Sequence, residues 1–158
     1  MATYASIKYD MDLSSNATGA GGMTLLSTQT ASSSSTISFT SGINSTYKEY
    51  IFKFINIHPA TNEQNFTFQA DTGTNTNYNQ TITSNFFRAY NQEDDGGTAL
   101  GYLTSRDQAQ GTSFQPLTVT IGNGNDECTN GTIHLFDPSN TTFVKHFISR
   151  FVDYEGGN

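Results

Sequence analysis

The sequence is short of cross-links, strand breakers and charge. It has one cysteine, three prolines and no tryptophan, and 13% of its residues are charged, against roughly 25% in an average soluble domain. A single cysteine excludes an internal disulfide. The sequence has seven Lys and Arg residues against 14 Asp and Glu, and no basic cluster. This balance argues against nucleic-acid binding, because phosphate contacts need cationic side chains. There is no long apolar run, so we expect no transmembrane helix and no membrane partner.

Ser, Thr and Asn are abundant instead, at 55 of 158 residues, together with 12 Phe and 8 Tyr. Aromatic and β-branched residues suit half-buried strands, and their number argues against a disordered chain. The length fits one domain with a core of its own. The composition therefore predicts an all-β protein whose core is built largely from aromatic rings.

The chain divides into a polar, Gly-rich lead over residues 1–22, read as an N-terminal arm or linker, and a β-domain over 23–158. About nine segments are predicted as strands from their alternation and their bounding turns. They are residues 23–29, 36–40, 48–58, 65–70, 80–90, 99–104, 114–121, 131–137 and 142–152. Many short strands with polar turns predict an antiparallel β-sandwich of about 8–9 strands, and the long loops favour a jelly-roll-like form.

Segment 48–58 carries the strongest strand pattern. Tyr50, Phe52 and Phe54 lie on one face by the period of two, and the other face is partly apolar. This pattern predicts a central strand covered on both sides. Because Pro59 ends it and a short turn follows, we expect an antiparallel hairpin with 64–70.

Residues that could carry chemistry are scattered. His58, His134 and His146 sit on separate predicted strands, without metal-ligand spacing. Cys128 follows two acidic residues rather than a base. No nucleophile or phosphate-loop motif occurs. We therefore expect no enzyme, no catalytic residue, no metal and no cofactor. One alternative stays open: the Asp/Asn-rich loops 91–95 and 123–127 offer oxygen ligands for a stabilising calcium ion.

Two tyrosines, Tyr78 and Tyr102, lie at or near predicted turns beside polar residues. Exposed aromatic rings beside Asn and Asp can stack on sugars and hydrogen-bond their hydroxyls. Packing in the core or in an interface is the competing interpretation. The pair is the sequence's candidate ligand contact.

Several stretches resemble a family of virion-associated proteins that is frequent in marine tailed phages, such as those of cyanobacteria and other ocean bacteria. The most specific segments are IHPATN, residues 57–62, and HLFDPSNTTFVKHFI, residues 134–148. The resemblance covers about residues 23–150. It implies a structural β-sandwich and attaches no catalytic residue. Family members run on past the position of Arg150 with more strands, which favours completion of the sheet by a partner subunit.

The resemblance and the composition together predict a non-enzymatic structural protein on the surface of a tailed-phage virion, assembled in the host cytoplasm. It would be a capsid decoration or cement protein, or a fibre or appendage subunit. Expected partners are other copies of the chain, as a trimer or another symmetric oligomer, and other virion proteins. The alternative is a carbohydrate-binding adhesion module that uses Tyr78 and Tyr102.

Overall fold

The computed structural model describes residues 22–154. The chain divides into two units, Met1–Thr30 and Ala31–Asn158. The predicted arm, 1–22, lies almost entirely outside the described residues. Residues 22–30 are exposed and contain no strand, so the strand predicted over 23–29 is wrong. None of these nine residues joins a ladder, and an alternating segment without a paired neighbour does not form a strand.

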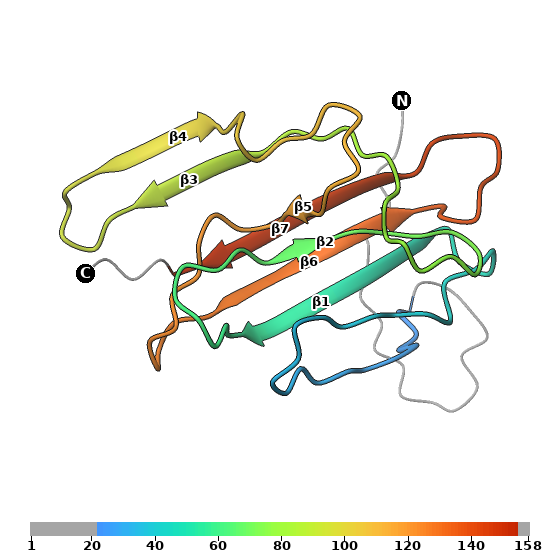
Figure 1. The fold of residues 1–158 in the computed structure, drawn as a ribbon, viewed down its shortest axis with the longest axis horizontal. Coiled ribbons are helices and arrows are strands. Elements are labelled where there is room, and N and C mark those ends of the chain that lie inside the picture. The colour runs from blue at the N-terminus through green and yellow to red at the C-terminus, as the bar shows by residue number, and fades with distance from the viewer. Residues whose placement is uncertain (1–21, 155–158) are drawn as a thin grey trace, which may run out of the picture. The chain divides into compact units, whose positions relative to one another are not determined.

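Seven β-strands and no helix occur within residues 22–154, which establishes an all-β fold (Figure 1). The strands are β1 (Glu49–Ile57), β2 (Thr67–Phe68), β3 (Phe87–Asn91), β4 (Thr98–Tyr102), β5 (Gln115–Pro116), β6 (Thr129–Phe136) and β7 (His146–Asp153). They form three small antiparallel sheets, ordered β1-β6-β7, β2-β5 and β3-β4. In the part described, no helix is long and apolar enough to cross a membrane.

Two expectations about β1 are wrong. β1 pairs with β6 and ends the sheet order, so β6 is the central strand. The expected hairpin with 64–70 does not form either, because β2 pairs with β5. Alternation reports which side chains share a face and carries no information on which strand lies alongside, so the long-range partner of β1 could not be read from it.

The far end of β1 is kinked by a bulge. The β1-β6 register shifts between Phe54 and Ile57, and Asn56 adopts a positive φ of 54°. Asn tolerates this left-handed conformation better than other side chains do. The Asn56 N–H donates to the Asn130 side-chain oxygen at 2.8 Å, which replaces a bond that the bulge removes from the ladder.

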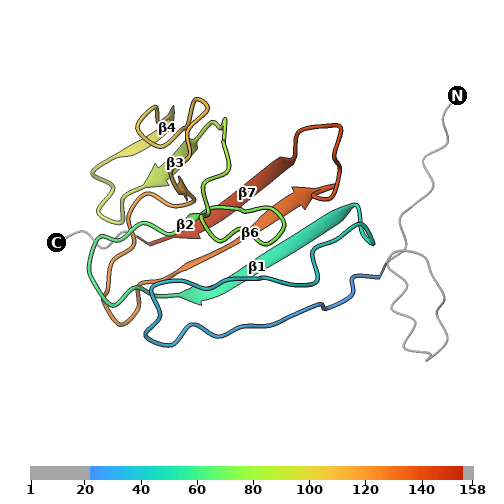
Figure 2. The same ribbon diagram turned by 45° about the vertical axis from the view of Figure 1, so that its right-hand side comes forward.

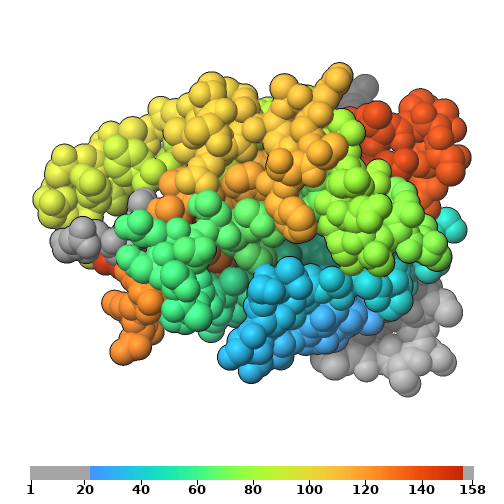
Figure 3. Space-filling model, viewed as in Figure 1, coloured from blue at the N-terminus to red at the C-terminus, as the bar shows by residue number. Residues whose placement is uncertain are grey.

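One face of the three-stranded sheet, here called the inner face, carries the core. Phe54 of β1, Phe151 of β7 and Phe66 before β2 form a triangle with ring centroids 5.0, 5.7 and 5.8 Å apart. Phe68 meets Phe147 edge-on at 4.9 Å, and Ile133 is buried between the two groups. In the space-filling view, the segments coloured green to yellow hide nearly all of β6 and β7 from this side (Figure 3).

Gly131 sits at the centre of the triangle, paired across the sheet with Phe54 and with Phe151. A Cβ at this position would lie 2.4 Å from the Phe151 ring and 2.5 Å from the carbonyl oxygen of Arg150. The absence of a side chain therefore lets two aromatic rings meet over the central strand.

Several of the predicted strands are shorter or absent in the structure. Within 114–121 only Gln115–Pro116 is a strand, since proline cannot donate to a ladder. Segment 36–40 forms no strand, and its Phe39 packs on Phe52 at 5.5 Å instead. The acidic turn at 91–97 does join β3 to β4, with Gln92 N–H donating to Gly97. Phe87 begins β3 with 66% of its surface exposed.

Candidate functional site

β7 presents an unpaired edge. It is last in the order of its sheet and, among residues 22–154, forms a ladder only with β6. Tyr154 N–H donates to the Cys128 carbonyl across that ladder. Hydrogen-bonded and non-hydrogen-bonded pairs alternate in an antiparallel ladder. The backbone groups of Phe147, Ser149 and Phe151 therefore point away from β6, toward the open side.

A groove of about 600 Å³ runs along this edge. One wall is residues 145–151 with Asp153, the opposite wall is residues 83–89, and Leu117 and Val119 also line it. Figures 1 and 2 show β3 beside β7 from two directions. The groove thus combines apolar and polar side chains with a row of backbone groups, an arrangement that can accept an extended peptide.

The groove concentrates positive charge in an acidic protein. Three of the seven Lys and Arg side chains in the sequence line it: Arg88, Lys145 and Arg150. His146 lies beside them, and Asp153 is the one carboxylate in the lining. Arg88 also lies over the Tyr90 ring at 4.4 Å. This charge favours an occupant with negative side chains.

The opposite face of the same sheet, here called the outer face, exposes aliphatic side chains. Ile148 is 63% exposed and Val152 is 69% exposed, both on β7. The polar members of this face include His134, whose Nδ1 lies 2.6 Å from Glu49 Oε1. The outer face thus mixes exposed apolar groups with hydrogen-bonded polar groups, a composition common at protein interfaces.

The two predicted ligand tyrosines lie on different elements, and no ring contact joins them. Tyr78 is half-buried in loop 71–80, and its N–H donates to Asp71 Oδ2 at 2.9 Å. Tyr102 ends β4, 44% exposed, with its ring edge-on to Phe87 at 5.3 Å. The Tyr102 hydroxyl donates to the Asp107 carboxylate, and this hydrogen bond raises the pKa of the phenol.

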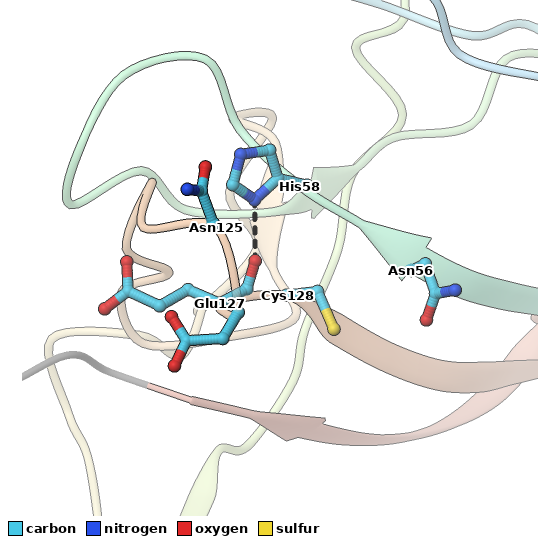
Figure 4. Close-up of a pocket in the computed structure, with 6 residues that line it drawn as sticks. Asn56, His58, Asn125, Glu127 and Cys128 are labelled. Carbon is cyan, nitrogen blue, oxygen red and sulfur yellow. Dashed lines mark hydrogen bonds between the residues drawn. The ribbon is translucent and has the colours of Figure 1, made fainter.

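A second hollow lies at the end of β1, lined by Asn56, His58, Cys128 and the loop 125–127 (Figure 4). His58 Nδ1 lies 2.6 Å from the Glu127 carbonyl oxygen, and Cys128 points its sulfur away from that ring. The Glu127 carboxylate accepts the Gly124 N–H of its own loop. No group of three or more metal-ligating side chains occurs among residues 22–154. The hollow therefore offers neither a thiolate paired with a base nor a ligand cluster.

Sequence reasoning missed the groove. Its walls are segments about 60 residues apart that no motif connects. The signal that could have found it is the double pattern in 142–152, with aromatic residues at odd positions and aliphatic residues at even ones. A strand with two apolar faces indicates a surface that a further element or a partner covers.

Comparison with family models, with curated proteins and with solved structures finds no significant match to this chain.

Proposed function

We propose that this chain is a non-enzymatic, self-associating structural protein of a tailed-phage virion surface. The observation that carries the proposal is the exposed aliphatic outer face beside the unpaired β7 edge, in a sheet whose inner face is already packed. A monomer gains nothing from these groups, whereas an assembly buries them. A second copy is the occupant we propose, because symmetric oligomers of one chain are the commonest assemblies.

The virion placement rests on the resemblance over residues 23–150. It also rests on an all-β, weakly charged domain that suits a shell of many identical contacts. Within this proposal the domain is a jelly-roll-like sandwich completed by a neighbour. Decoration of the capsid is the first placement, and a fibre or appendage subunit is the second.

Light scattering on the purified chain tests self-association, and binding to expanded capsids tests the placement. We expect a defined oligomer and a fixed ratio to the shell protein. A monomer at every concentration tested would overturn the proposal. An oligomer that does not bind capsids would move the chain to the fibre or appendage placement.

Carbohydrate binding is the second candidate, favoured by one observation. Tyr102 and Phe87 form an exposed aromatic pair with the Asp107 carboxylate at the tyrosine hydroxyl. Such a platform offers a sugar both a stacking face and a hydrogen-bond acceptor. A glycan array tests it: binding should fall on Tyr102→Ala more than on Tyr78→Ala, whose ring stands apart from this pair. An array without hits would remove this function.

A further inference from the structure

We infer that the groove beside β7 is a strand-acceptor site that binds residues 7–13 of a second copy of this chain as a fourth strand of the β1-β6-β7 sheet. The inference deepens the proposed self-association and rests on it. It begins from the backbone groups of Phe147, Ser149 and Phe151, which point into the groove without another strand to pair with among the described residues. Added strands satisfy such groups by main-chain hydrogen bonds.

The groove sets a pattern for its occupant. Its apolar lining, Leu117 and Val119 with the rings of Phe147 and Phe151, lies on the inner side, and Arg150 and His146 lie on the outer side. An added strand must therefore alternate apolar residues on one face with polar residues on the other. To complement the lining, its polar face must carry carboxylates.

Residues 7–13, IKYDMDL, have this pattern. Ile7, Tyr9, Met11 and Leu13 alternate with one lysine and two aspartates, so one face is apolar and the other is mostly acidic. Seven residues extend over about 23 Å, close to the length of an eight-residue strand such as β7. The rival occupant, β7 of a second copy, would bring Arg150 of both copies to the same side of the paired strands, and like charges oppose that pairing.

Side-chain parity and charge favour the antiparallel register that keeps both aspartates beside Arg150. Tyr9 then lies opposite Phe151, Met11 opposite Ser149, and Leu13 opposite Phe147. The same register places Asp10 opposite Arg150 on the outer side and Asp12 opposite Ile148, between Arg150 and His146. A slip by one residue would turn the aspartates toward the aromatic lining, and a slip by two in one direction would set Lys8 against Arg150.

Disulfide trapping in the full-length chain tests this register. All chains carry Cys128→Ser to remove the native thiol. One population carries Met11→Cys, and a second, distinguishable by size, carries Ser149→Cys. Opposed positions in a ladder fall within the Cα separation that a disulfide requires. We expect a cross-linked dimer of the two populations when they are mixed.

In the matched control, the acceptor carries Ile148→Cys in place of Ser149→Cys. Position 148 lies one residue along, and its side chain is on the outer face and points away from Met11. The control should therefore give about tenfold less cross-linked dimer. Arg150→Glu in the acceptor should lower the yield about fivefold, and Asp10→Lys in the donor should restore it.

The possible outcomes distinguish the strand-acceptor site from the proposed self-association on which it rests. An oligomer in light scattering without the 11–149 cross-link would overturn the strand-acceptor site and leave self-association standing. Equal yields at positions 148 and 149 would also overturn it. So would a chain that carries both Met11→Cys and Ser149→Cys and forms its disulfide only within itself. A monomer in light scattering would overturn both.

Discussion

The two faces of the β1-β6-β7 sheet are built from the same three strands and differ in what covers them. The inner face presents Phe54, Phe147 and Phe151, each in ring contact with Phe66 or Phe68 from the segment that crosses it. The outer face presents Ile148 and Val152, both largely exposed. Alternation along the strands places apolar residues on both faces, so sequence pattern alone does not distinguish them.

Most of the large rings of this sheet lie on the packed inner face, although Phe136 lies on the outer face beside His134. Large rings bury enough area to hold a thin sheet together, while aliphatic groups mixed with charges remain available for association. Substitutions on the inner face should therefore change the free energy of unfolding. Substitutions on the outer face should change assembly instead.

The largest effect is expected for Phe54→Ala. The Phe54 ring contacts both Phe66 and Phe151, so its removal takes one corner from the triangle and leaves a cavity beside the other two rings. Truncation of a packed phenylalanine costs about 3 kcal/mol. Urea unfolding should show this loss as a lower midpoint at unchanged slope. A loss no larger than that of an exposed residue would break the distinction between the faces.

A smaller loss, about 2 kcal/mol, is expected for Gly131→Ala, because the new Cβ collides with the Arg150 carbonyl oxygen and the Phe151 ring. The control is Gly101→Ala in β4, where a Cβ would meet nothing within 4 Å. That control should stay within about 0.5 kcal/mol of the parent in the same urea titration. Equal effects at the two glycines would show that the rings do not need the bare backbone of β6.

Strand existence was largely predictable, and strand pairing was not. Segments 48–58 and 131–137 were predicted within two residues because alternation against polar neighbours is a local signal. The pairing of β1 with β6 joins residues about 80 apart, and no local pattern encodes it. Segment 23–29 shows the converse, since it alternates and still forms no strand.

The candidate site was predictable only in part. The exposure of Tyr102 follows from its place beside a turn, but its partner Phe87 comes from the neighbouring strand and could not be read from spacing. Tyr78 is held by loop 71–80, in which Asp71 gathers the backbone N–H groups of Thr72 and Tyr78. The groove depends on segments 83–89 and 145–151 meeting in space, which only tertiary structure reveals.

On the outer face, Ile148→Asp should leave the unfolding midpoint within about 0.5 kcal/mol of the parent, because the side chain is mostly exposed. The same change should shift the oligomer toward smaller species in light scattering, since a carboxylate would be buried in the contact. Leu100→Asp is the control, because Leu100 lies in β4, outside this sheet and the groove lining, and is 80% exposed. A destabilised but fully associated Ile148→Asp chain would reverse the roles of the two faces.

The smallest effect belongs to a polar loop that lies on neither face. The Tyr78 N–H, followed by those of other loop groups, holds the pKa of Asp71 below its ordinary value of 3.8. A carboxyl whose pKa is depressed by folding stabilises the protein above its unfolded pKa, and this contribution disappears as the pH falls through the lower folded value. Asp71→Asn should therefore lower the urea midpoint slightly at pH 7, and the gap to the parent should close as the pH falls below 3.8. Asp95→Asn, in the exposed turn between β3 and β4, is the control and should show no such closing gap. If the gap for Asp71→Asn stayed constant with pH, the loop would be held by the shape of the side chain rather than by its charge, and the stability of the domain would rest on the aromatic inner face alone.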